Sequence, residues 1–154
     1  MTHGLDTGFL VALELHEHAD HADAAAKLAG HIAAGDRIAV APQVLSEFLH
    51  VVTDSRRFTK PFDMVTARQV AEKWWTAAEV IQIFPDDAAT RQFLTCVGQH
   101  KLGRKRLLDT LLAATFREAS IFSILTTNST DFAIFGIFTC FTPSSAASPG
   151  PPPP

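Results

Sequence analysis

The sequence predicts an α/β fold whose mostly parallel sheet carries helices on both faces. Short apolar runs typical of strands alternate along the chain with longer segments in which apolar residues recur every three or four positions, as in amphipathic helices. Strands that are separated by helices return to the sheet through crossovers, which makes them parallel and leaves the helices against the faces. An apolar fraction of 47% in 154 residues is enough for one domain with a sizeable core.

The first half of the chain alternates as such a fold requires. The expected elements are, in order, a strand at 1–5, helices at 7–15 and 19–35, a strand at 37–41 and a helix at 42–53. Gly35 is a natural breaker at the carboxyl end of the second helix, because glycine readily adopts the left-handed conformation found there. Pro42 stops the strand before it and suits the first turn of the helix that follows, where a missing N–H costs nothing.

The second half continues the alternation and ends in a polar tail. The expected elements are a helix at 61–78, a strand at 80–84, helices at 86–102 and 104–120, a strand at 122–128, a helical turn at 131–135 and a strand at 138–142. Asp86 and Asp87 suit the first turn of their helix, where free backbone N–H groups favour negative charge. We assign the folded domain to residues 1–143 and expect residues 144–154, which are rich in Pro and Ser, to be disordered.

Composition excludes several classes of protein. A formal charge of −3 and a pI near 6.1 are too mild to indicate a nucleic-acid or membrane protein, so any surface that binds a polyanion must be local. Cys96 and Cys140 form neither a metal-binding spacing nor a framework of disulfides, which fits a reducing compartment. The first 15 residues do not resemble a signal peptide, and the longest apolar run is half a membrane span. We therefore expect a cytoplasmic protein that does not enter a membrane.

One acidic residue interrupts the apolar face of the helix expected at 104–120. At about 100° per residue, Asp109 projects among Leu112, Ala113 and Phe116. An ionised carboxylate in this position is costly unless a cation, hydrogen bonds or solvent compensates it. Either a positive group meets Asp109, or the helix begins at Thr110 and Asp109 is its N-cap.

Three further acids occupy related places. Asp6 directly follows the first strand, Asp131 follows the fourth strand, and Glu47 lies one turn into the helix after the second strand. In an open parallel sheet these places meet at one edge, outside the carboxyl ends of the strands. Each acid has a simpler explanation, since Asp6 and Asp131 could cap the helical turns that follow them and Glu47 could be a solvated residue. A divalent cation explains all three together with Asp109, because Mg²⁺ and Mn²⁺ prefer oxygen ligands and unpaired carboxylates repel one another.

The four acids stand in short motifs along the chain. Asp6 lies in LDTGFLVAL, Glu47 in VLSEFLHVVTDSRRF, Asp109 in LLDTLLAATF and Asp131 in TTNSTDF. In this order and spacing, over residues 3–143, the motifs resemble the PIN-domain ribonucleases, especially the VapC-type toxins of bacterial toxin-antitoxin pairs. The resemblance implies a three-layer α/β/α sandwich and an endoribonuclease in which a metal-activated water attacks an RNA phosphodiester.

The resemblance also assigns roles and partners. The acids implied as catalytic are Asp6, Glu47, Asp109 and Asp131. The first three form the core of the metal site, with Asp131 as a more variable fourth member, and Asp6 and Asp109 are the expected metal ligands. Thr7 and Asn128 match polar positions that assist the site. The family further implies Mg²⁺ as cofactor, with Mn²⁺ as an alternative, and an RNA substrate, a cognate antitoxin protein and a homodimer as partners.

Basic residues cluster after the helix of Glu47 and before Asp109. They are Arg56, Arg57, Lys60, Lys101, Arg104, Lys105 and Arg106. Solvated surface is the default interpretation of such short basic runs. A carboxylate pocket alone would repel phosphate, however, so a nuclease needs cations beside it. The candidates for RNA contact are Arg56, Arg57, Lys105 and Arg106.

Two other functions compete with a nuclease. A phosphotransferase of the haloacid-dehalogenase type also begins with an aspartate after the first strand, but it needs a second acid two residues later, where this chain has Gly8. A catalytically silent PIN-like module that binds RNA or protein stays open, although the presence of all four acids favours an enzyme. His16, His18 and His21 are spaced too irregularly to indicate a zinc site.

Overall fold

Helices and strands alternate throughout residues 1–144, the part of the chain that the computed structural model describes. Apart from Ser144, the tail expected at 144–154 lies outside the described residues. The elements of residues 1–144 are β1 (Thr2–Leu5), α1 (Thr7–Glu14), α2 (His21–Ala33), β2 (Arg37–Val40), α3 (Pro42–Val52), α4 (Met64–Thr76), β3 (Val80–Gln82), α5 (Asp87–Gln99), the 3₁₀ turn η1 (Arg104–Arg106), α6 (Leu107–Glu118), β4 (Ser123–Leu125), α7 (Ser129–Ala133) and β5 (Thr139–Phe141). Every helix and strand expected from the sequence is present, with ends shifted by a few residues. None of the helices in this part of the chain has the length and apolar character that a bilayer-spanning segment requires.

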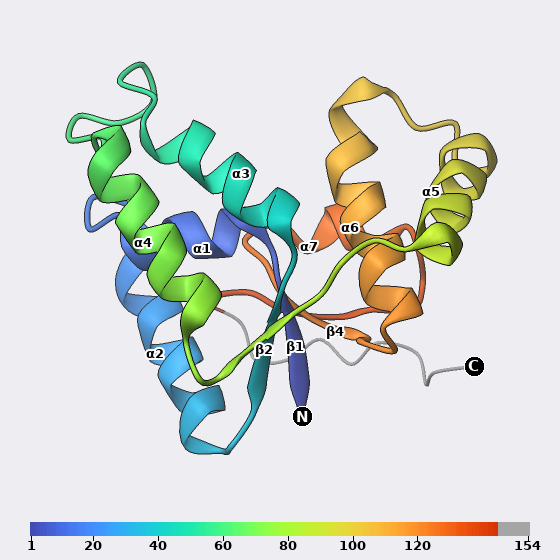
Figure 1. Cartoon of the computed structure of the whole chain (residues 1–154), viewed down its shortest axis with the longest axis horizontal. Coiled ribbons are helices and arrows are strands. Elements are labelled where there is room, and N and C mark those ends of the chain that lie inside the picture. The colour runs from blue at the N-terminus through green and yellow to red at the C-terminus, as the bar shows by residue number, and fades with distance from the viewer. Residues whose placement is uncertain (145–154) are drawn as a thin grey trace.

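The strands of residues 1–144 form one parallel sheet in the order β3-β2-β1-β4-β5. β1 lies in the middle, where His3 pairs with Ile38 of β2 and Leu5 pairs with Leu125 of β4. Figure 1 shows helices α1 to α4 on one side of the sheet and helices α5 and α6 on the other. The predicted three-layer α/β/α sandwich with a parallel sheet is therefore confirmed.

Aromatic rings fill the core between the sheet and the helices. The largest fully buried side chains are Phe9, Phe48, Phe116 and Phe132, from α1, α3, α6 and α7. Gly4 lets α6 approach the central strand closely, because a Cβ at this position would lie 2.5 Å from the ring of Phe116. This contact holds α6, the helix that carries Asp109, against β1.

The start of α6 settles one of the alternatives for Asp109. Because α6 begins at Leu107, Asp109 lies within its first turn, and the interpretation as an N-cap of a helix beginning at Thr110 is wrong. Leu108 fits the apolar spacing of the expected helix, but in the structure it is 51% exposed. The buried residues of α6 are instead Thr110 and residues 112–116, and Asp109 lies at their margin, partly exposed.

Candidate active site

Four carboxylates lie near the carboxyl ends of the central strands. Asp6 directly follows β1, and Glu47 lies on α3, which follows β2. Asp109 lies in the first turn of α6, and Asp131 lies in α7, which follows β4. The charges of Asp109 and Glu47 raise the pKa of Asp6, and those of Asp131 and Glu47 raise the pKa of Asp109. The fold thus brings all four acids into one electrostatically coupled cluster.

Asp6 is held by a loop from the far end of the chain. It occupies the N-cap position of α1, but its side chain makes no capping hydrogen bond. Instead, Thr126 Oγ1 donates to Asp6 Oδ2 at 2.7 Å, and the residue is only 8% exposed. Gly8 permits this arrangement, because a Cβ there would lie 2.4 Å from Thr127 Oγ1. Capping therefore does not explain Asp6, and Thr126 is a partner that the sequence pattern did not reveal.

Glu47 is fixed by the residue that follows Asp6. Thr7 is buried, and its Oγ1 donates to Glu47 Oε2 at 2.8 Å. Glu47 itself is half-buried, so it is not the freely solvated residue of the simpler explanation. The start of α1 therefore carries one acid of the cluster and orients a second through a neighbouring hydroxyl.

Asp131 lies at the centre of a small polar network. Asn128 is the N-cap residue of α7, and its Nδ2 donates to Asp131 Oδ2 at 2.6 Å. Arg106 approaches from η1, with Nη1 at 2.7 Å from Asp131 Oδ1 and Nη2 donating to the Asp131 carbonyl oxygen. Because Asp131 lies inside α7 and Asn128 precedes the helix, the interpretation of Asp131 as a helix cap is wrong.

Arg106 is also the positive group that meets Asp109. Its Nε lies 3.9 Å from Asp109 Oδ2, beyond hydrogen-bond distance, and has no hydrogen-bond partner among the described residues although it is buried. The guanidinium thus bridges Asp109 and Asp131 electrostatically while one of its N–H groups stays unsatisfied. The unpaired N–H group could donate to an acceptor such as a phosphate oxygen, but it could not bind a metal ion.

The electrostatics of the cluster show a deficit of positive charge. Burial raises the pKa of Asp6 to about 7, against the opposing hydrogen bonds from Thr126 and the Thr7 backbone, and the charges of Asp109 and Glu47 add smaller increases. Burial also raises the pKa of Asp109 to about 6, helped by Asp131 and Glu47 and opposed by Arg106. Near neutral pH, both carboxyl groups would be stabilised in their ionised form by an added cation.

The donor set fits a hard dication such as Mg²⁺ or Mn²⁺. All four candidate ligands are carboxylates, which these ions prefer. Within residues 1–144, one group of three His, Cys, Asp or Glu side chains has ligand atoms that all lie within 4.8 Å of one another, and it lies at the other edge of the sheet. The four acids therefore do not form a closed cage. Mg²⁺ commonly uses only one or two carboxylates and keeps several waters. An open site with Asp6 and Asp109 as protein ligands meets that requirement.

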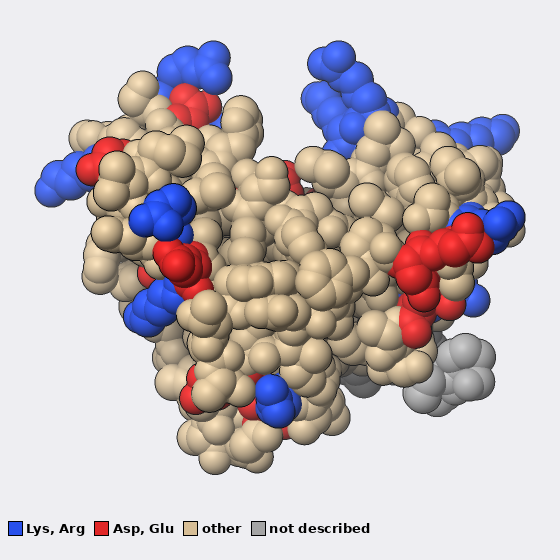
Figure 2. All heavy atoms as spheres, viewed as in Figure 1, with Lys and Arg blue, Asp and Glu red and all other residues tan. Residues whose placement is uncertain are grey.

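A groove beside the acids offers room for a polymer. Its volume is about 760 Å³, and its lining includes Glu47 and His50 of α3, Arg57 and the exposed Leu108. Figure 2 shows the surface hollowed between the α3 and α6 sides, with Lys and Arg side chains above both rims. The sequence assigned neither residue to the site, because Leu108 fits the apolar face of its helix and His50 looks like an ordinary surface residue.

The four candidate RNA contacts differ in their surroundings. Arg56 and Arg57 are exposed and share the carboxylate of Asp54, with the closest approach of Arg56 at 3.0 Å and of Arg57 at 3.6 Å. Lys105 is exposed, whereas Arg106 is 25% exposed and turned toward the acids. Three of the candidates are therefore accessible from solvent, and the fourth lies within the acidic cluster.

The fold and the cluster together define a parallel α/β protein with an acidic site at the carboxyl edge of its sheet. No model of a known protein family matches the chain, and no curated protein matches its sequence. Solved structures of toxin-antitoxin proteins do match. VapC20 of Mycobacterium tuberculosis, a sarcin-ricin loop cleaving toxin, matches with a TM-score of 0.65 and 18% identity over 87% of this chain and 95% of that one.

Two further matches are complexes. VapBC2 from Rickettsia felis, bound to a DNA fragment from its promoter, matches with a TM-score of 0.66 and 18% identity over 92% of this chain and 98% of that one. VapBC-1 from nontypeable Haemophilus influenzae matches with a TM-score of 0.64 and 13% identity over 94% of this chain and 100% of that one. At such low identity, the likeness shows that the chain has the PIN-like fold of these proteins.

Proposed function

We propose that this chain is a metal-dependent endoribonuclease and the toxin of a toxin-antitoxin pair. The observation that carries the proposal is the coupled cluster of four acids, in which burial and mutual repulsion raise two pKa values. A single guanidinium from Arg106 cannot balance four carboxylates, so the cluster favours a dication. The PIN-like fold supports the same function, because one of the matched structures is a toxin that cleaves the sarcin-ricin loop.

Each residue of the cluster has a distinct part in this proposal. Asp6 and Asp109 hold Mg²⁺ or Mn²⁺, and Thr126 keeps the Asp6 carboxylate in place. When bound, the ion would lower the pKa of a water molecule and offset negative charge on the phosphate. Thr7 occupies one oxygen of Glu47, which leaves Oε1 to accept a proton from the attacking water.

The basic residues position the RNA in this proposal. Arg56, Arg57 and Lys105 are exposed, so they can bind backbone phosphates that enter the groove. Arg106 acts as the internal counterion of the metal-free site through its contacts with Asp131 and Asp109. A dication at Asp109 would take over that charge and release the guanidinium toward phosphate.

We further propose a cognate antitoxin and a homodimer as partners, in the cytoplasm. VapBC complexes with the same fold support the antitoxin. A basic side chain or a helix of the antitoxin would enter the acidic groove and exclude RNA. The basic side chain would bind the carboxylates, and the antitoxin would fill the groove that RNA needs.

The proposal is tested by RNA cleavage with purified protein in Mg²⁺ or Mn²⁺, with and without EDTA. We expect EDTA, Asp6→Asn and Asp109→Asn each to reduce cleavage by about 100-fold or more. Asp87→Asn is the matched control, since this exposed acid forms its ion pair with Arg91 on α5, away from the acidic cluster, and it should leave cleavage unchanged. Cleavage that survives EDTA and both site variants would overturn the proposal. RNA binding without metal-dependent cleavage would instead identify a catalytically silent module.

A further inference from the structure

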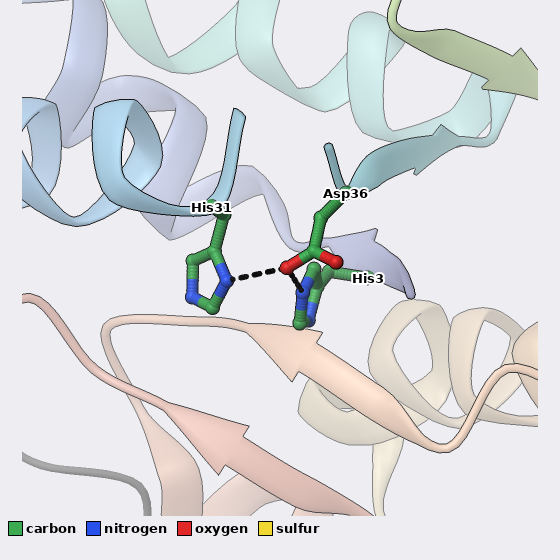
Figure 3. A group of neighbouring side chains, drawn as sticks. All are labelled: His3, His31 and Asp36. Atoms are coloured by element: carbon green, nitrogen blue, oxygen red, sulfur yellow. Dashed lines mark hydrogen bonds and ion pairs between the residues drawn. The ribbon is translucent and has the colours of Figure 1, made fainter. Parts of the chain in front are cut away.

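A second cluster of polar side chains lies at the opposite, amino-terminal edge of the sheet. His3 lies on β1, His31 near the end of α2, and Asp36 in the turn that leads into β2. Within residues 1–144 it is the one group of three His, Cys, Asp or Glu side chains whose ligand atoms all lie within 4.8 Å of one another. Figure 3 shows both imidazole rings turned toward the same carboxylate. The nuclease mechanism makes no use of these residues.

The spacing of the three side chains matches that of ligands around one ion. Asp36 Oδ2 lies 2.9 Å from His3 Nε2 and 3.1 Å from His31 Nδ1. Zinc in a tetrahedral site has Zn–N and Zn–O distances of about 2.0 to 2.1 Å, which puts neighbouring ligand atoms about 3.3 Å apart. The two printed separations are hydrogen-bond distances, so both hydrogen bonds would open and the side chains would move apart to admit the ion.

His3 has the supporting contact that a metal ligand needs. Its ring is 1% exposed, and Nδ1 lies 2.5 Å from the hydroxyl oxygen of Ser123. A histidine that binds a metal through one nitrogen donates a hydrogen bond from the other, which fixes the tautomer and the ring orientation. Because a hydroxyl can either donate or accept, Ser123 satisfies Nδ1 in the metal-free and in the metal-bound tautomer.

The surroundings combine an apolar wall with a route for the ion. The edge of Phe141 meets the ring of His3 at a centroid distance of 5.4 Å and the ring of His31 at 5.0 Å. A cavity of about 540 Å³ opens beside His31 and Phe141, and Asp23 contributes to its lining. The cavity therefore reaches the cluster at His31, with Lys27 as well as Asp23 in its lining.

We propose that His3, His31 and Asp36 bind one Zn²⁺ ion, with a water as fourth ligand. Two imidazole nitrogens and one carboxylate favour Zn²⁺ over Mg²⁺, which prefers oxygen ligands alone. The ion would join β1, α2 and the turn before β2, and would replace the hydrogen bonds between Asp36 Oδ2 and both rings. Asp36 Oδ1 would keep its contact with the N-terminal ammonium, which lies 2.6 Å away. It would thus stabilise the edge of the sheet that lies away from the acids.

The test uses the full-length protein, stripped with EDTA and dialysed, and titrated with Zn²⁺ against a chromophoric chelator in excess Mg²⁺. Excess Mg²⁺ competes with zinc for the proposed oxygen-rich site, and the variants below distinguish the cluster from the other histidines. We expect one equivalent to bind, and Co²⁺ in its place to give the intense visible absorption of a four-coordinate ion. Zn²⁺ should also raise the melting temperature.

Variants locate the site. His31→Ala and Asp36→Ala should each weaken zinc binding by about 100-fold or more, since even substitutions beside a metal ligand cost 10-fold to 100-fold. The matched control is the double variant His16→Ala/His21→Ala, which removes another pair of adjacent rings, 4.5 Å apart, and should bind zinc like the wild type. Circular dichroism without metal verifies that each variant folds, and His31→Gln replaces any that does not. Absence of zinc uptake by the wild type, or retention of uptake in both His31 and Asp36 variants, would overturn the proposal.

Discussion

Replacing Asp6 with asparagine should stabilise the metal-free protein while it abolishes cleavage. The carboxyl group is buried beside Asp109 and Glu47, and its pKa is raised from 3.8 to about 7. Asparagine keeps an oxygen that can accept from Thr126 but carries no charge. The variant therefore removes the repulsion and the cost of burying a charge without leaving the Thr126 hydroxyl unpaired.

The size of the effect follows from the linkage between ionisation and folding. A carboxyl group whose pKa is higher in the folded state than in the unfolded state lowers the free energy of unfolding at every pH above the unfolded-state pKa. For Asp6 this penalty is absent below pH 4, grows as the pH rises, and is complete above pH 7. At 1.36 kcal/mol for each pKa unit, the upper bound is about 4 kcal/mol. Rearrangement of side chains and entry of water reduce it, so we expect a gain of about 1 to 3 kcal/mol at pH 8.

Urea unfolding followed by circular dichroism in EDTA, at pH 8 and again at pH 4.5, measures this gain. The advantage of Asp6→Asn over the wild type should be largest at pH 8 and shrink toward pH 4.5. Addition of Mg²⁺ at pH 8 should stabilise the wild type but not the variant. The control Asp87→Asn alters an exposed ion pair and should change stability by less than about 0.5 kcal/mol. The reasoning would be refuted if Asp6→Asn were less stable than the wild type at pH 8. It would also be refuted if the stability difference between variant and wild type were the same at pH 8 and pH 4.5.

Three other variants test the positioning of the site and its contacts with RNA. Thr7→Val removes the hydroxyl that orients the carboxylate of α3, so cleavage should fall by about 10-fold with little change in melting temperature, as single-turnover kinetics would show. Gly8→Ala places a Cβ 2.4 Å from Thr127 Oγ1, which should destabilise the fold by about 1 to 3 kcal/mol in urea unfolding. In the catalytically inactive Asp6→Asn background, Arg56→Ala/Arg57→Ala should weaken RNA binding. The slope of log K, the logarithm of the RNA association constant, against log salt concentration should become shallower by about one for each phosphate contact that is lost. An unchanged cleavage rate, stability or salt dependence would contradict each prediction in turn.

Much of the architecture is encoded locally. The pattern of apolar residues predicts every helix and strand of the described chain. Helices are recognised by apolar residues three or four positions apart, and strands by short apolar runs, so both signals are local. Gly35 has a φ of 81° just beyond α2, and Pro42 opens α3, as their chemistry predicts. Asp86, expected in the first turn of its helix, instead precedes it and accepts from the Ala89 N–H.

The positions of the candidate acids along the chain were also accessible from the sequence. Parallel strands place their carboxyl ends at one edge, so Asp6, Glu47 and Asp131 could be expected there from the order of elements alone. Asp109 interrupts the apolar face of its helix, which predicted either a compensating cation or a capping role. Arg106 is one such cation, and a bound dication is the second that we propose.

The contacts that orient these groups depended on the tertiary structure alone. Thr126 reaches Asp6 across 120 residues of sequence, and Arg106 reaches Asp131 across 25. No periodicity encodes such pairs, because they arise only when the order β3-β2-β1-β4-β5 brings separate loops to one edge. The same folding gathers His3 and Asp36 at the opposite edge. The sequence by itself determined which segments become helices and strands and which acids lie at their ends, whereas the packing of distant segments decided which side chains meet.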